Sequence, residues 1–133
     1  MIHVKHKTDQ HPLIGKKAPI FDFSSYKNIN KQLTKSSSIL IFLDQDCIHC
    51  NSNIQNFLEG IQNKKNIDYS VVISKEQFIK AKEINSLYPD IPIMIVDKEV
   101  FYKYQISLFP SYVLINTEGI IKNITPVPFK VIV

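Results

Sequence analysis

The hydrophobic positions of this chain gather in short runs that have the length of strands. The run at 39–43, Ile-Leu-Ile-Phe-Leu, contains no polar residue, which is typical of a strand buried on both faces. Other apolar segments predict further strands at 68–74, 91–96, 111–116 and 120–125. The alternating segment 18–23 predicts a short edge strand, because Pro19 is tolerated near the start of such a strand.

Amphipathic stretches between these strands predict helices. From about 48 to 63, apolar residues recur one turn apart on a single helical face: Ile54, Phe57, Leu58 and Ile61. A second pattern predicts a helix over 75–88 that ends before Pro89. Four of its residues are expected to face the core: Phe78, Ala81, Leu87 and Tyr88. A short helix is predicted over 98–104, and the polar segment 26–38 predicts a loop with one helical turn near 30–34.

The predicted order of elements is β, β, α, β, α, β, α, β, β. Strands that alternate with helices and end in a hairpin are typical of the α/β class, here with a central mixed sheet flanked by helices. The turn Asn116-Thr117-Glu118-Gly119 joins the last two strands, and Gly119 can adopt a positive φ. Residues 1–17 are polar and without period, so we expect a flexible lead-in followed by one domain over 18–133.

Length, charge and hydropathy narrow the class of protein. At 133 residues the chain can bury one hydrophobic core. Its net charge of +4 comes from scattered lysines rather than a basic stripe, so we expect a solvated surface and no nucleic-acid partner.

No apolar run approaches the roughly 20 residues of a transmembrane helix. Residues 1–17 lack the apolar core of a secretion signal, so we expect an extracytoplasmic protein whose signal or anchor was removed, or otherwise a cytoplasmic one.

The two cysteines, Cys47 and Cys50, carry the candidate chemistry. A bridge between them closes too short a loop to stabilise the fold much. They lie where the buried strand gives way to a helix, so both would face one side, with α-carbons about 5 Å apart. The helix N-terminus would stabilise a thiolate on the more exposed Cys47, which could attack a disulfide while Cys50 resolves the product. A strand–CxxC–helix arrangement therefore predicts redox chemistry.

Charged neighbours of the pair act in opposite directions. A protonated His49 would favour a thiolate at Cys47, whereas Asp44 and Asp46 would disfavour it. Two plainer interpretations stay open: Asp46 caps the helix N-terminus, and His49 faces solvent without a tuning role.

Metal binding through the cysteines is an alternative hypothesis. A zinc site needs about four ligands, and the chain has no second CxxC. The lead-in histidines His3, His6 and His11 could complete a site only in principle. We therefore expect neither a metal nor a cofactor.

The CxxC pair is followed by Leu108-Phe109-Pro110-Ser111, and together these motifs resemble the thioredoxin superfamily. The resemblance implies that Pro110 is a cis-proline facing the cysteines, that Phe109 packs beside them, and that the backbone before Pro110 can pair with a substrate strand. An X-Pro bond can adopt the cis form at little cost. The segment 15–23, with its G-x-x-A-P-x-F pattern, and the later Glu118-Gly119 resemble the TlpA-like branch of thiol-disulfide oxidoreductases.

Three departures from the family pattern point to a specialised relative. Asp46 stands where a tryptophan is usual, and no acidic residue occupies the buried strand 39–43, where thioredoxin has a proton-transfer carboxylate. The usual C-terminal helix is expected to be missing, because 125–133 contains two prolines and a β-branched tail.

The sequence thus predicts a thiol-disulfide oxidoreductase that exchanges electrons with protein thiols and disulfides and with a redox partner protein. By its resemblance to the TlpA-like branch, we favour a reductant. A non-catalytic binding module that holds a partner through its groove or the tail 127–133 is the alternative. A peroxiredoxin is disfavoured, because Asp44 and Leu40 stand where that family has a hydroxyl residue and a proline.

Overall fold

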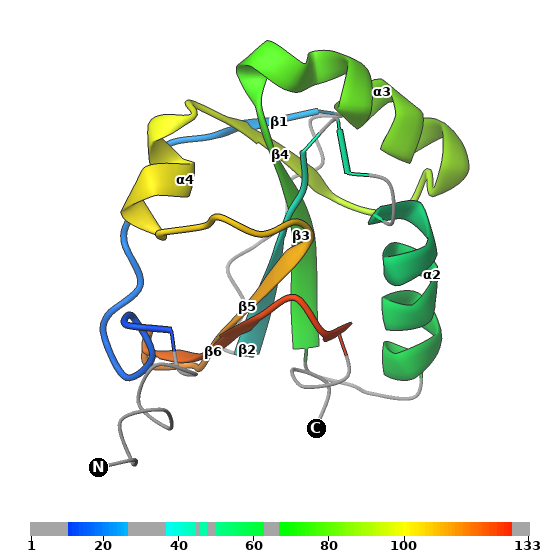
Figure 1. Cartoon of the computed structure of the whole chain (residues 1–133). Coiled ribbons are helices and arrows are strands. Elements are labelled where there is room, and N and C mark those ends of the chain that lie inside the picture. The colour runs from blue at the N-terminus through cyan, green and yellow to red at the C-terminus, as the bar shows by residue number, and fades with distance from the viewer. Residues whose placement is uncertain (1–10, 27–36, 45, 48–49, 63–66, 129–133) are drawn as a thin grey trace, which may run out of the picture.

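A six-stranded mixed sheet forms the centre of the molecule (Figure 1). The computed structural model describes residues 11–26, 37–44, 46–47, 50–62 and 67–128. The elements in chain order are β1 (Ser24–Ser25), β2 (Ser37–Phe42), α2 (Cys50–Ile61), β3 (Ile67–Ser74), the 3₁₀ turn η1 (Lys75–Gln77), α3 (Phe78–Leu87), β4 (Ile93–Val96), α4 (Glu99–Lys103), β5 (Ser111–Ile115) and β6 (Ile121–Thr125). The strand order is β1-β4-β3-β2-β5-β6. Strands β2, β3 and β4 are parallel, and the other pairings are antiparallel, so the α/β prediction is confirmed.

Strand β2 lies near the middle of the sheet and is buried on both faces, as its unbroken apolar run predicts. Successive side chains of a strand point to opposite faces. Ile39 and Ile41 accordingly pack in the cluster beneath α2 and α3, whereas Leu40 and Phe42 pack in the cluster beneath α4. The two layers of helices are visible on either side of the sheet in Figure 1.

Helix α2 confirms the amphipathic pattern. Ile54, Phe57 and Ile61 are buried against the sheet, and Leu58 packs at the edge of the same cluster. Each such side chain contributes about 1.5–3 kcal/mol of transfer free energy when fully buried. The helix begins at Cys50, and residues 48 and 49, where the predicted start falls, lie outside the described part of the chain.

The predicted edge strand at 18–23 is wrong. Lys17 forms an isolated bridge with Ile120, and the Ala18 N–H donates to the Gly119 carbonyl at 2.8 Å, but the chain then leaves this edge of the sheet. It runs past α4 to form the two-residue β1 beside β4. Along the way the Pro19 carbonyl accepts a hydrogen bond from the Tyr104 hydroxyl at 2.7 Å, so a side chain replaces the partner strand.

The inward face predicted for the second helix is partly wrong. Phe78 and Leu87 are 47% and 52% exposed, whereas Ala81, Ile84 and the charged Lys80 are buried. Phe78 and Leu87 both lie in α3 and are nine residues apart, which is about two and a half turns of a regular helix, so they cannot share one buried face.

The hairpin between β5 and β6 is confirmed. Gly119 has a φ of 81°, and the Asn116 side chain accepts from the backbone N–H groups of Glu118 and Ile120, both at 2.9 Å. Residues 11–17 of the predicted lead-in are bonded to the same edge, where the Gly15 N–H donates to the Ile121 carbonyl at 2.7 Å.

Beyond β6, the described residues 126–128 contain no α-helix, and the rest of the segment on which the loss of the C-terminal helix was predicted, 129–133, lies outside the described part of the chain. Among the described residues, no helix has the length and apolar character needed to cross a membrane. The predicted turn at 30–34 lies outside the described residues.

Candidate functional site

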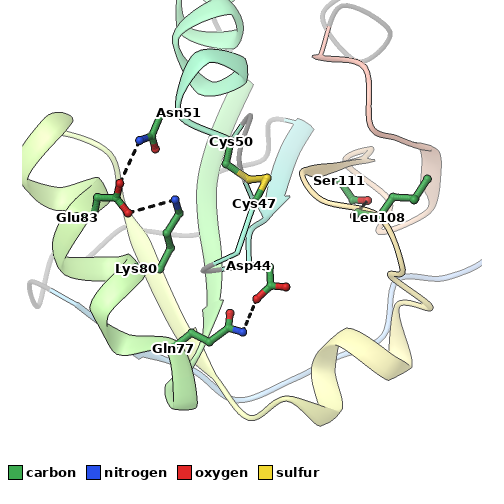
Figure 2. The surroundings of a disulfide bond; sticks show 9 residues. All are labelled: Asp44, Cys47, Cys50, Asn51, Gln77, Lys80, Glu83, Leu108 and Ser111. Carbon is green, nitrogen blue, oxygen red and sulfur yellow. Dashed lines mark hydrogen bonds and ion pairs between the residues drawn. A yellow bond between two sulfur atoms is a disulfide. The ribbon is translucent and has the colours of Figure 1, made fainter.

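The pairing of the strands places the cysteine loop beside the predicted cis-proline. Strand β5 runs antiparallel to β2, so its first residue, Ser111, lies opposite Phe42, the last residue of β2. The loop that leaves β2 leads to Cys47, and Pro110 immediately precedes β5. Two segments about sixty residues apart in the sequence therefore meet at one end of the sheet (Figure 2).

Cys47 and Cys50 form a disulfide with an S–S distance of 2.06 Å and a Cα–Cα distance of 5.4 Å. Cys50 is the first residue of α2 and is fully buried, whereas Cys47 is only partly buried in the turn before the helix. The Cys47 N–H donates to the Asp44 carbonyl at 3.2 Å, which holds that turn against the end of β2. Cys47 is therefore the more accessible of the two cysteines.

The Phe109–Pro110 peptide bond is cis, as the family resemblance implies. The Ser111 hydroxyl donates to the Leu108 carbonyl at 2.6 Å and closes the loop around the proline. Phe109 is half-buried and, like Cys47, packs against the core cluster beneath α2 and α3, and Leu108 is 60% exposed. The loop before Pro110 is thus closed by a hydrogen bond and carries one exposed apolar side chain.

The acidic residues of the cysteine loop differ in their surroundings. Asp44 accepts a hydrogen bond from the Gln77 side chain, because the parallel strands β2 and β3 end at the same edge of the sheet. Asp46 is exposed, and the proposed tuning role of His49 falls on a residue outside the described part of the chain.

A polar cluster between α2 and α3 was missed by the sequence analysis. The Asn51 amide donates to Glu83 Oε1 at 3.1 Å, and the Lys80 ammonium donates to Glu83 Oε2 at 3.2 Å. These hydrogen bonds hold the pKa of the Glu83 carboxyl below its usual value, and the bond from Asn51 has the largest effect. The i, i+3 spacing of Lys80 and Glu83 could have indicated the ion pair. Their contact with Asn51 depends on the packing of two helices, which no local pattern encodes.

A second feature missed from the sequence is a hollow of about 290 Å³ at the loop before Pro110. Its lining includes Ile106, Leu108, Ser111, Ile124 and Thr125, so β6 and the loop enclose it together.

The described residues contain no group of three or more histidine, cysteine or acidic side chains placed to hold a metal ion. His3 and His6 lie outside those residues, and His11 forms a hydrogen bond between its Nε2 and the Gln105 carbonyl at 2.9 Å. The alternative of a binding module relied on the apolar tail 127–133. The structure describes this tail only as far as 128, and Val127 is exposed.

No protein-family model matches the chain, and no curated protein sequence matches it. Several solved structures do. The thioredoxin domain of a thiol-disulfide oxidoreductase from Bacteroides vulgatus is 20% identical, with a TM-score of 0.63 over 84% of this chain and 86% of that one. A thiol:disulfide interchange protein of the thioredoxin family from Chlorobium tepidum is 17% identical, with a TM-score of 0.58 over 74% and 77%.

The N-terminal domain of PilB from Neisseria gonorrhoeae is 22% identical, with a TM-score of 0.56 over 68% of this chain, and the alignment spans only 66% of that domain. At these identities the similarity concerns the fold. The chain has a thioredoxin-like fold, with its Cys47–Cys50 disulfide and cis-Pro110 at the end of the sheet where β2 and β5 meet.

Proposed function

We propose that this protein is a thiol-disulfide oxidoreductase that exchanges its Cys47–Cys50 pair with protein substrates. One observation carries the proposal: a disulfide joins a partly exposed Cys47 to a fully buried Cys50 at the start of α2. This difference in access supports Cys47 as the attacking and Cys50 as the resolving residue, because an attacking thiolate must reach a substrate sulfur and a resolving one need only reach its neighbour.

In the reducing direction, the reduced Cys47 thiolate attacks one sulfur of a substrate disulfide. The substrate S–S bond breaks, its second sulfur leaves as a thiolate that takes up a proton, and a mixed disulfide forms. The Cys50 thiol then loses its proton and attacks the Cys47 sulfur, which releases the substrate dithiol. Two electrons pass to the substrate, so a redox partner dithiol must reduce Cys47–Cys50 again.

Pro110 and its loop would shape the place where the substrate polypeptide lies. Pro110 has no N–H, and Leu108 in the loop before it is largely exposed. The hollow lined by Leu108 and Ser111 on either side of the proline offers room for a side chain of a bound polypeptide. These features favour a polypeptide substrate.

We further propose that the protein acts as a reductant in an extracytoplasmic compartment, where stable protein disulfides are found. Equilibration with glutathione tests the direction: a reduction potential near about −270 mV supports a reductant, and one near about −120 mV indicates an oxidant. Fractionation of cells that contain the protein tests the location, and recovery in the cytoplasmic fraction would contradict it.

Trapping tests the exchange itself. Cys50→Ser, incubated with oxidised insulin or another disulfide-bonded polypeptide, should accumulate a mixed disulfide at Cys47, detected by mass spectrometry without reductant. Cys47→Ser is the matched control and should form no adduct in the same time, because the remaining Cys50 is fully buried. Absence of the Cys50→Ser adduct, together with no insulin reduction by the wild-type protein, would refute the proposal.

A further inference from the structure

The cluster of Asn51, Lys80 and Glu83 adjoins the buried cysteine through the chain itself. Asn51 follows Cys50 directly in the first turn of α2, and its side chain lies 3.1 Å from Glu83. Glu83 in turn lies 3.2 Å from the Lys80 ammonium. Figure 2 shows the Lys80 side chain extending from α3 toward the start of α2, where Cys50 lies.

Lys80 is unusual because it is a buried cation. Only 4% of its side chain is exposed, whereas the Glu83 side chain is 46% exposed. Lysine is almost never fully buried without a partner, since removing its charge from water is costly. Water screens the charge of Glu83 more effectively than that of Lys80. The two charges therefore do not cancel in the protein interior.

The cluster is also tied to the core that contains the cysteines. Ala81 and Ile84 of α3 belong to the same buried cluster as Cys50, so α3 is packed against the disulfide side of the sheet. The Tyr88 hydroxyl donates to the Asn51 backbone carbonyl at 3.2 Å and adds a second link between the two helices. This packing holds α3, which carries Lys80 and Glu83, against the start of α2, which carries Cys50.

We propose that Lys80 and Glu83 are positioning residues that set the redox equilibrium of the Cys47–Cys50 pair with opposite signs. This inference rests on the proposed exchange at those cysteines. The disulfide carries no charge, whereas the reduced pair carries a partial negative charge as a thiolate. A buried cation nearby stabilises the thiolate and hence the reduced form, and a carboxylate disfavours it. No carboxylate of the buried strand 39–43 competes with this pair.

The test measures the equilibrium with glutathione, in which two glutathione thiols reduce the protein disulfide and become one glutathione disulfide. Lys80→Met removes the cation and should shift the equilibrium about three- to tenfold toward the protein disulfide, which corresponds to a potential about 15–30 mV lower. Glu83→Gln retains hydrogen-bonding groups but removes the anion, and it should shift the equilibrium in the other direction by a similar factor. Lys80→Arg retains the positive charge and should give the same equilibrium constant with glutathione as the wild-type protein.

Lys82→Met is the matched control, because Lys82 lies on the same helix and is exposed, and it should leave the equilibrium unchanged. A purely structural role predicts shifts of one sign, or none, for Lys80→Met and Glu83→Gln. Shifts of the same sign, or changes below twofold in both variants, would overturn the inference. If Lys80→Met does not fold, Glu83→Gln decides alone: a shift toward the dithiol supports the inference, and no shift overturns it.

The glutathione equilibrium does not depend on any protein substrate. A failure of the trapping experiment would therefore remove the proposed function, whereas a failure here would remove only the role of Lys80 and Glu83.

Discussion

Two buried tyrosines show how differently the same residue type can be accommodated. Both Tyr104 and Tyr112 are fully buried. The Tyr104 hydroxyl donates to the Pro19 carbonyl at 2.7 Å, whereas the Tyr112 hydroxyl has no hydrogen-bond partner among the described residues. The Tyr112 ring is nevertheless stacked on Phe57, with centroids 5.4 Å apart. Tyr112 is therefore retained in the core by its ring alone.

We expect opposite outcomes when the two hydroxyls are removed. Tyr104→Phe should lower the free energy of unfolding by about 1–2 kcal/mol, because the Pro19 carbonyl loses its donor. Tyr112→Phe should leave that free energy unchanged or raise it, since it removes a buried polar atom without a partner and keeps the stacked ring. Urea unfolding of the oxidised proteins measures both. An equal loss in Tyr112→Phe would mean that its hydroxyl is hydrogen-bonded.

At the scale of elements, the β5–β6 hairpin depends on one backbone conformation. Gly119 has a φ of 81°, and a Cβ placed there would meet no atom within 4 Å, so the cost of a side chain comes from the backbone alone. We expect Gly119→Ala to lower the free energy of unfolding by about 1–2 kcal/mol. Gly119→Asn should cost less, because asparagine tolerates positive φ. Thr117→Ala, an exposed change in the same turn, serves as the control. Equal costs for alanine and asparagine would contradict this explanation.

The helices show how far a local pattern determines an element. The pattern in α2 correctly predicted its buried face, because a regular helix repeats every 3.6 residues from start to end. The same reasoning misplaced Phe78 and Leu87 of α3, because residues nine positions apart lie on opposite sides of a regular helix; the face of α3 that is buried contains Ala81 and Ile84 instead. Lys80 lies on the same buried side of α3, so the sequence could indicate its i, i+3 pairing with Glu83 but not the contact of Glu83 with Asn51 beside Cys50.

For the whole molecule, burial of tyrosines predicts a loss of stability in alkaline solution. Burial raises the pKa of Tyr104 from 10.0 to about 12, and it also raises the pKa of Tyr112. A pKa that is higher in the folded than in the unfolded state contributes stability below pH 10, and this contribution is lost as the pH rises toward 12. Near pH 11 the loss from Tyr104 alone should be about 1 kcal/mol.

Urea unfolding at pH 9 and pH 11 tests this prediction, in a Cys47→Ser/Cys50→Ser background that prevents disulfide exchange. Tyr104→Phe should reduce the difference between the two pH values by about 1 kcal/mol. Tyr102→Phe should not change it, because Tyr102 is exposed. An unchanged difference in Tyr104→Phe would show that its hydroxyl ionises equally in the folded and unfolded states.

The sequence by itself determined the features that depend on short-range spacing. These are the buried strand β2, the apolar face of α2, the hairpin at Gly119 and the pairing of Cys47 with Cys50, since neighbouring residues alone set strand alternation, helical periodicity and turn geometry. The cis form of Pro110 was implied by the family resemblance rather than by spacing.

Three features depend on the packing of the whole chain: the edge of the sheet that the N-terminal segment joins, the face that α3 buries, and the meeting of Lys80 and Glu83 with Asn51 beside the cysteines. These contacts join segments that lie far apart in the chain. Their free energy depends on how whole elements pack together, and no single segment contains that information.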